Sequence, residues 1–204
     1  MQRAFSSNDV RLLEDSDVFQ GYYRVRRLTL EHRAFAGGWS APLTRELFER
    51  GDAVGVLPWD VERDELVLIE QFRVGALRDA DSPWMLEIVA GIVEPGESDE
   101  EVAQRETVEE AGLELIALEP MLSFFPSPGA CSEHVRLFAG QIDASAAIGL
   151  HGVAEEGEDI RVHRLRRSDV MALVDANRIN NGHTLMALLW LRVYGDALRQ
   201  RWLA

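Results

Sequence analysis

Three glutamates crowd one side of a helix that the segment GIVEPGESDEEVAQRETVEEAGL, Gly91–Leu113, predicts near the middle of the chain. Glu106 lies one helical turn from both Glu109 and Glu110, and like charges at that spacing repel by roughly 0.2–0.5 kcal/mol per pair. Arg105 is the only basic side chain in the segment. A divalent cation such as Mg²⁺ takes oxygen ligands from one or two carboxylates and keeps positions open for substrate phosphates. The arrangement therefore predicts a magnesium platform for a phosphate substrate.

The ends of this helix are marked by residues with capping chemistry. Ser98 is a good N-cap, and Glu101 three residues later completes a capping box. Gly112 is a natural residue for the position after the helix, so we expect the helix to run from about Asp99 to Ala111. A neighbouring stripe of small side chains would let the helix pack closely on a sheet, and it consists of Ala103, Thr107 and Ala111.

The residues before the helix explain how its carboxylates are aimed. Trp84–Ala90 reads as a strand, and a loop containing Pro95-Gly96 connects it to the helix. A strand, a tight loop and an acidic helix in this order would bring the backbone carbonyl of Ala90 towards the helical carboxylates.

Composition limits the classes of protein to which the chain can belong. Its 204 residues suit one substantial domain, or a core domain with a small appendage. The formal net charge of −14 argues against a nucleic-acid partner, which requires a basic surface. A single cysteine, Cys131, excludes an intrachain disulfide, and the N-terminus lacks an apolar signal segment. The longest apolar run near the C-terminus, Leu185–Leu191, is far shorter than the ~20 residues of a membrane span, so we expect a cytoplasmic protein without membrane contacts.

The first fifty residues differ from the rest. Alternating apolar and polar side chains predict a half-buried strand over 21–33, and another extended piece follows over 40–48. Residues 1–50 therefore form a small, mostly β unit with few core residues, which would lean on the rest of the molecule or on a second subunit.

Residues 51–204 carry the stronger pattern of a domain. Buried strand runs are expected at Val54–Leu57 and Leu66–Ile69, with further strands near 115–125, 134–142 and 160–165. A helix capped by Ser168 should reach about Asn177, and a longer helix should run from about Thr184 to Arg201. Strands flanked by an early and a late helix predict the α/β class, with a mixed sheet between helices.

The segment Gly91–Leu113 resembles the Nudix box, G-x5-E-x7-R-E-U-x-E-E-x-G-U, in which U is a bulky aliphatic residue. Eight fixed positions agree, and they are Gly91, Glu97, Arg105, Glu106, Glu109, Glu110, Gly112 and Leu113. Thr107 departs from the pattern at a packing position, which concerns local packing more than chemistry. An ordinary solvated acidic helix would not be expected to match so many positions at the right spacing. The resemblance implies the α/β/α sandwich of Nudix domains.

Segments beyond the box resemble the ADP-ribose pyrophosphatase branch of the Nudix hydrolases. They are SFFPSPGACSEHVRLFAG at 123–140 and GLHGVAEEGEDIRVHRL at 149–165, and the resemblance extends over nearly the whole chain. It implies Mg²⁺-dependent hydrolysis of ADP-ribose to AMP and ribose 5-phosphate, with Mn²⁺ as a substitute ion. Two alternatives stay open: a pyrophosphatase for another nucleotide sugar such as GDP-mannose or ADP-glucose, and a silent module that binds ADP-ribose. The complete acidic set of the box argues against the silent module.

The resemblance assigns roles to individual acidic residues. The implied metal ligands are the carbonyl of Ala90 and the carboxylates of Glu106, Glu110 and Glu158. The implied catalytic residues are Glu156 as general base, Glu109, which holds a metal or orients the water, and Arg105, which braces the loop–helix geometry together with Glu97. Glu155, Glu158 and a metal hydroxide stay open as alternatives for the base. A mobile, solvated acidic loop without a catalytic role is the other interpretation of this segment.

Substrate contacts are implied in both parts of the chain. In the N-terminal unit they are Tyr22, Tyr23, Arg45, Glu46 and Arg50, which match base- and ribose-binding positions. In the remaining chain they are Arg73, which would reach the phosphates, Ile92, and the pocket loop residues Ser127, Pro128, Gly129 and Glu133. A tyrosine pair on an alternating strand is equally typical of sheet packing. Because the N-terminal unit of the related enzymes exchanges between subunits, we expect a homodimer that binds a small-molecule nucleotide sugar.

Overall fold

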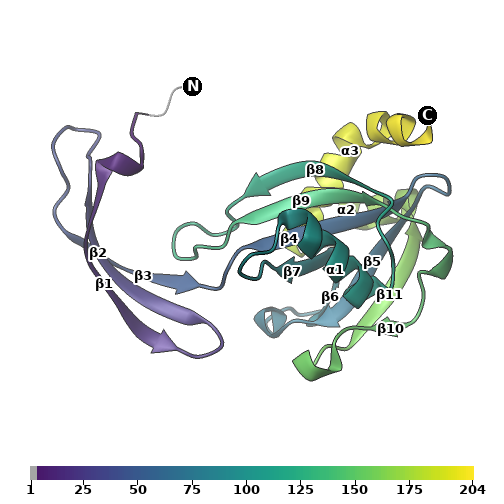
Figure 1. The fold of residues 1–204 in the computed structure, drawn as a ribbon, viewed down its shortest axis with the longest axis horizontal. Coiled ribbons are helices and arrows are strands. Elements are labelled where there is room, and N and C mark those ends of the chain that lie inside the picture. Colours follow the sequence, from purple (N-terminus) through teal and green to yellow (C-terminus); the bar gives the residue numbers. More distant parts are fainter. Residues whose placement is uncertain (1–3) are drawn as a thin grey trace. The chain divides into compact units, whose positions relative to one another are not determined.

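The chain divides into two units in the computed structural model, which describes residues 4–204 with the exception of the Glu156 side chain (Figure 1). One unit contains the chain up to Asp52 together with Phe125–Glu133, and the other contains Ala53–Phe124 and His134–Ala204. The smaller unit therefore includes a loop that the sequence analysis assigned to the main domain.

The smaller unit is a three-stranded antiparallel sheet in the order β1-β2-β3. Its strands are β1 (Val10–Gln20), β2 (Arg24–His32) and β3 (Leu43–Glu49). Two of them correspond to the extended segments expected from the sequence, whereas β1 was not expected. Every residue of β1 is exposed, and ion pairs such as Asp15 with Arg26 connect it to β2. The Phe125–Glu133 loop joins this unit through the backbone of Phe48, whose N–H donates to Ala130 and whose carbonyl accepts from Ser132.

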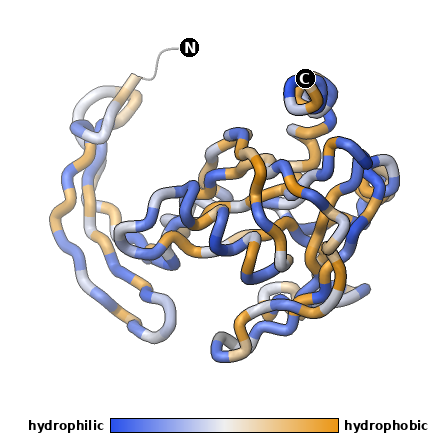
Figure 2. Tube along the Cα trace, turned by 45° about the vertical axis from the view of Figure 1, so that its right-hand side comes forward, coloured by the Kyte–Doolittle hydropathy of each residue, from blue (hydrophilic) through white to orange (hydrophobic). Residues whose placement is uncertain are grey.

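The larger unit is built on a mixed sheet in the order β10-β11-β5-β4-β9-β8, with β6 paired to β5 and β7 paired to β4. Its strands are β4 (Ala53–Asp60), β5 (Glu65–Phe72), β6 (Trp84–Glu87), β7 (Val89–Ile92), β8 (Ala117–Phe124), β9 (Val135–Gln141), β10 (Leu150–His151) and β11 (Ile160–Arg166). Among the strands that the structure describes in this sheet, β4 and β9 are the one pair that runs parallel. All residues of β4 are buried, as expected for a central strand covered on both faces. Figure 2 shows hydrophobic residues along these central strands.

The sheet opens where β4 and β5 diverge, and this opening positions the site. The two strands pair directly only at Trp59–Asp60 with Glu65–Leu66. Beyond that point β6 pairs with β5 and β7 pairs with β4. The segment Trp84–Ile92 therefore crosses from β5 to β4. The single strand expected over Trp84–Ala90 is therefore interrupted at Ile88.

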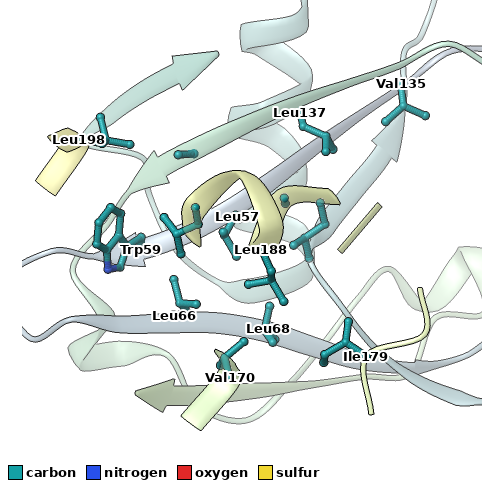
Figure 3. Close-up of a cluster of buried hydrophobic side chains, with 14 of the residues drawn as sticks. Leu57, Trp59, Leu66, Leu68, Val135, Leu137, Val170, Ile179, Leu188 and Leu198 are labelled. Atoms are coloured by element: carbon teal, nitrogen blue, oxygen red, sulfur yellow. The ribbon is translucent and has the colours of Figure 1, made fainter. Parts of the chain in front are cut away.

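Helices cover both faces of the larger sheet, and this confirms the expected α/β/α sandwich. They are α1 (Asp99–Ala111), α2 (Arg167–Asp175) and α3 (Gly182–Leu203), accompanied by short 3-10 turns at Ser7–Asp9, Val74–Ala76, Ala144–Ala146 and Ala154–Glu156. Helix α1 lies on one face, and α2 and α3 lie on the other (Figure 1). The core beneath α2 and α3 combines Leu57, Leu66 and Leu137 of the strands with Val170 and Leu188 of the helices (Figure 3). Burial of each such side chain contributes roughly 1.5–3 kcal/mol.

The ends of the two later helices differ from the sequence expectations. Helix α2 begins after Arg166, which provides no side-chain cap, so the prediction that Ser168 caps it was wrong. Ser168 lies inside the first turn, where its hydroxyl contacts Asp169. Helix α3 begins at Gly182 and is capped by Asn181. In the described part of the chain, no helix is both long enough and apolar enough to cross a membrane.

Candidate active site

Helix α1 presents its acidic residues from a firmly packed base. The predicted boundaries and capping box are confirmed: the Ser98 hydroxyl accepts from the backbone of Glu101, whose carboxylate accepts from the backbone of Ser98. The predicted small stripe is buried against the sheet, with Thr107 fully inaccessible. The Thr107 hydroxyl donates to the Ala103 carbonyl at 2.7 Å, so its polar atom is satisfied. The departure from the family pattern at Thr107 therefore leaves the packing intact.

Gly91 lets the strand approach the acidic helix very closely. A Cβ atom at this position would lie 1.7 Å from Oε1 of Glu106, far inside any van der Waals contact. Gly112 has a comparable role at the end of the helix, because its φ of +66° is left-handed and a Cβ there would lie 2.5 Å from the His151 ring. The His151 side chain thus packs on the C-terminal end of α1.

Gly91→Ala is expected to displace the Glu106 carboxylate, because the two groups cannot occupy the same space. Since Glu106 has most of its side chain buried, it cannot simply swing into solvent. For the hydrolase that the sequence resemblance implies, we expect turnover to fall roughly 10–100-fold, the usual effect of misaligning a metal ligand. Steady-state kinetics beside a thermal unfolding curve measures this. Gly75→Ala is the matched control because a Cβ there meets nothing within 4 Å. Unchanged turnover in Gly91→Ala would contradict the close approach.

Arg105 is the hub that orients the acidic face. Its Nε and Nη2 donate to the two oxygens of Glu97 at 2.9 and 3.0 Å, and Nη2 also reaches the Ile92 carbonyl at 3.3 Å. Its Nη1 donates to Glu106 at 2.6 Å and to Glu109 at 3.2 Å. The guanidinium therefore contacts three carboxylates and one carbonyl, which suits its planar fork of donors.

Glu110 is the most deeply buried member of the acidic face, with only 2% of its surface exposed. Burial raises its pKa to about 8, the backbone N–H of Ala90 and the charge of Arg73 oppose this rise, and Glu106 and Glu158 add to it. The Ala90 N–H donates to Glu110 Oε2 at 2.9 Å. Because the N–H and C=O of one strand residue point to the same side, the Ala90 carbonyl lies on the edge that faces Glu110.

The acidic loop after β10 brings Glu158 to the same region. The Glu158 carboxylate accepts from the Val153 N–H at 3.0 Å, and its charge acts on both Glu106 and Glu110. The loop is attached to α1 by a hydrogen bond from Gly152 N–H to the Glu109 carbonyl at 3.1 Å. The side chain of Glu156, the expected general base, lies outside the described part of the structure.

The donor set has the chemistry of a site for a hard divalent cation. Glu106, Glu110 and Glu158 provide carboxylate oxygens in electrostatic range of one another, and burial raises the pKa of Glu106 as well. Burial raises these pKa values although Arg105 lies beside Glu106 and the charge of Arg73 acts on Glu110, and a bound cation would supply further positive charge. Within the described residues no three acidic, cysteine or histidine side chains are already gathered as a metal site. Each carboxylate instead accepts from Arg105, Ala90 or Val153.

Arg73, the expected phosphate contact, is held by an acidic residue that the sequence analysis did not select. Its Nε and Nη2 donate to the carboxylate of Glu87 at 3.0 and 2.8 Å. Glu87 is buried, and Asn181 also donates to it at 3.0 Å. An acidic residue at the end of a strand of otherwise apolar residues was the available signal for Glu87.

The remaining predicted substrate residues lie in the smaller unit, where several of them meet. The Tyr23 ring makes edge contacts with Tyr22 and with Phe48, and the Arg50 guanidinium lies 5.8 Å from its centroid. Arg50 also pairs with the buried Glu133 at 3.3 Å. Phe48 is thus an aromatic member of this cluster that the sequence analysis missed. The available signal was its spacing, because Phe48 lies two residues after Glu46 and so on the same face of β3.

Other predicted substrate residues of this unit stand apart from that cluster. Arg45 and Glu46 are neighbours on β3 and so point to opposite faces of the sheet. Glu46 pairs with Arg27 at 3.6 Å, and Arg45 donates to the Thr44 carbonyl. The expected pocket loop is exposed at Ser127, Pro128 and Gly129.

Comparisons with known proteins agree on one family. The NUDIX domain model matches residues 49–184. The ADP-ribose pyrophosphatase of Escherichia coli (strain K12) is 43% identical over 198 residues, which cover 97% of this chain and 95% of that protein. The ADP-ribose pyrophosphatase of Haemophilus influenzae is 40% identical over 201 residues, covering 97% and 93%. The GDP-mannose pyrophosphatase of Pectobacterium atrosepticum is 32% identical over 183 residues, covering 89% and 93%.

A solved structure shares the fold. The crystal structure of an ADP compounds hydrolase superposes with a TM-score of 0.72 at 24% sequence identity, and the match covers 96% of this chain and 98% of that chain. The likeness supports the architecture described above.

Proposed function

The chain belongs to the Nudix family, and from this premise we propose that it is a hydrolase that cleaves the diphosphate of ADP-ribose to AMP and ribose 5-phosphate. Its relatives at 40–43% identity are ADP-ribose pyrophosphatases, whereas the similarity to GDP-mannose pyrophosphatases is lower. The observation that carries the proposal is the set of carboxylates of Glu106, Glu110 and Glu158, which act on one another electrostatically, with Glu110 buried and Glu106 beside the Gly91 close approach. Such a cluster suits a reaction at a diphosphate, where neutralising charge is the main task.

Nudix hydrolases generally use a divalent metal, and we propose Mg²⁺ held by the Ala90 carbonyl with Glu106, Glu110 and Glu158. When bound, the cation would supply charge neutralisation for the diphosphate and acidify the attacking water. Arg105 keeps Glu106 and Glu109 oriented through its hydrogen bonds. A silent binding module would not require this complete acidic set.

We propose that residues of the chain accept the proton of the attacking water and stabilise the leaving group. Glu156 is proposed as the general base that takes a proton from water as the water oxygen bonds to phosphorus. The bridging P–O bond breaks, and the departing phosphate keeps the electron pair. Arg73 would balance part of the negative charge that develops there, since a guanidinium offers a fork of donors to phosphate oxygens. Glu109, at the edge of the cluster, would orient the attacking water.

Substrate selection is proposed to come from the smaller unit. Tyr23 and Phe48 provide aromatic faces that stack on a base, while Arg50 and Glu133 provide polar groups for the ribose. We propose a cytoplasmic homodimer in which this unit of one subunit completes the site of the other. Sedimentation of the purified chain tests the dimer, and a stable, active monomer would rule it out.

The proposal is tested by comparing substrates under matched conditions. We expect kcat/KM for ADP-ribose with Mg²⁺ to exceed that for GDP-mannose and ADP-glucose by at least tenfold, a difference of about 1.4 kcal/mol in transition-state binding. Removal of divalent cations with EDTA should abolish turnover, and Mg²⁺ or Mn²⁺ should restore it. A preference for GDP-mannose would replace the proposed substrate, and full activity in EDTA would contradict the role given to the carboxylates.

A further inference from the structure

A chain of hydrogen bonds runs from the first turn of α3 to the guanidinium of Arg73. Asn181 uses both ends of its amide: Oδ1 accepts from the backbone N–H of Thr184 at 3.0 Å and thereby caps α3, and Nδ2 donates to Glu87 Oε1 at 3.0 Å. The capping residue of a helix far along the chain thus contacts an acidic residue of β6. Nothing in the capping function requires that second contact.

Glu87 connects Asn181 to Arg73, because both donate hydrogen bonds to its carboxylate. Only 3% of Glu87 is exposed, and a buried carboxylate is costly unless a positive charge and hydrogen bonds satisfy it. Arg73 supplies the charge through Nε and Nη2, and Asn181 supplies a further donor. A two-pronged contact fixes the plane of a guanidinium as well as its distance.

The same network fixes the interruption between β6 and β7. The Thr184 hydroxyl accepts from the Ile88 N–H at 3.0 Å and donates to Asn181 Oδ1 at 3.0 Å. Thr184 and Ile88 are both buried. Ile88 lies two residues before Ala90, whose N–H binds Glu110, so the network holds the strand that enters the acidic cluster.

Arg73 in turn lies within electrostatic range of that cluster, since its charge interacts with Glu110 and Glu158. The hydrogen bonds of Arg73 to described residues come from Nε and Nη2 and all go to Glu87, and 43% of the side chain is exposed, so the Nη1 edge of the guanidinium remains for a ligand. Glu87 therefore holds the Nε and Nη2 edge of the Arg73 guanidinium, and the Nη1 edge is available to a substrate phosphate.

We propose that Glu87 and Asn181 are positioning residues that act through Arg73, holding its guanidinium where it meets the diphosphate of the substrate. This role rests on the proposed function, because it takes Arg73 as the phosphate contact. It extends the active site to the N-terminus of α3, a part of the chain remote in sequence from the acidic helix.

Asn181→Ser separates the two functions of this residue. Serine is as good an N-cap as asparagine, so α3 stays capped, but its hydroxyl is too short to donate to Glu87. We expect KM for ADP-ribose to rise roughly three- to tenfold, the effect of one lost hydrogen bond, with a smaller change in kcat and a melting temperature close to that of the wild type. Calorimetric affinity for ADP-ribose in EDTA should fall by a similar factor. Asn180→Ser is the matched control, because Asn180 contacts Asp79 and should leave KM unchanged.

A double-mutant cycle decides whether the effect passes through Arg73. In an Arg73→Ala background, Asn181→Ser should cause no further rise in KM, because the residue that it positions is absent. Glu87→Gln tests the same role independently. We expect it to raise KM for ADP-ribose roughly 10–100-fold, and this rise should be absent in the Arg73→Ala background. Equal effects of Asn181→Ser with and without Arg73, or no effect in either background, would overturn the positioning role. If the wild type itself does not cleave ADP-ribose, the proposed function fails first and the positioning role falls with it.

Discussion

Glu110→Gln is expected to lower turnover by roughly 10²–10³-fold or more while leaving the fold intact. Glutamine has the shape of glutamate, and its amide oxygen can still accept from the Ala90 N–H. What is lost is the negative charge at the centre of the acidic cluster, where we propose that a divalent cation binds. Steady-state kinetics at saturating Mg²⁺ measures the effect. The exposed Glu100 on the same helix gives the matched control, since Glu100→Gln removes the same charge and should leave turnover unchanged.

The same substitution should change how stability depends on pH in the metal-free protein. The pKa of Glu110 is about 8 when folded against an ordinary value of 4.5, so the folded state holds this proton more tightly than the unfolded chain. The resulting stabilisation is complete below about pH 4.5 and is lost as the pH rises through about 8. Unfolding curves in EDTA should therefore show a decline over that range in the wild type and a weaker decline in Glu110→Gln. Identical pH profiles would show that Glu110 does not carry a raised pKa.

Arg105→Gln is expected to damage both stability and catalysis. The substitution leaves Glu97, Glu106 and Glu109 without the cation that they share. Removing one partner of a buried pair costs about 3–5 kcal/mol, and since 30% of the Arg105 side chain is exposed we expect about 1–3 kcal/mol. Turnover should fall roughly 10–100-fold because Glu106 loses its orienting donor.

Arg105→Lys tests whether charge or geometry matters more at this hub. Lysine restores the positive charge but cannot reproduce the fork that spans Glu97 and the helix. We therefore expect stability to recover in large part and turnover to recover only partly. Denaturant unfolding and steady-state kinetics on both variants measure this. Full recovery of turnover in Arg105→Lys would reduce the role of Arg105 to simple charge balance.

The acidic helix could be predicted from sequence because its determinants are local. Ser98, Glu101 and Gly112 mark its ends by chemistry that acts within one turn, and the boundaries Asp99–Ala111 are confirmed. The spacing of its glutamates also placed them on one face. The α/β/α architecture followed from the order of strands and helices together with the family resemblance.

Features that depend on distant contacts escaped the sequence analysis. Strand β1 buries none of its residues and is defined by its pairing with β2, so its hydrophobic pattern gave no signal. The sequence analysis did not select Asn181, because its contact with Glu87 spans 94 residues. The interruption at Ile88 likewise arises from the divergence of β4 and β5. The roles given to individual site residues stay predictions, which the variants above are designed to test.

Hydrolysis of ADP-ribose in oxygen-18 water with Mg²⁺, followed by mass analysis of the products, tests the central account most directly. We expect AMP and ribose 5-phosphate in equal amounts, one of them carrying a single heavy oxygen on its phosphate, and roughly 10²–10³-fold less of both from Glu110→Gln over the same interval. Intact ADP-ribose in the wild-type reaction, or cleavage to ADP and ribose without label on a phosphate, would contradict the assignment of the carboxylate cluster to diphosphate hydrolysis.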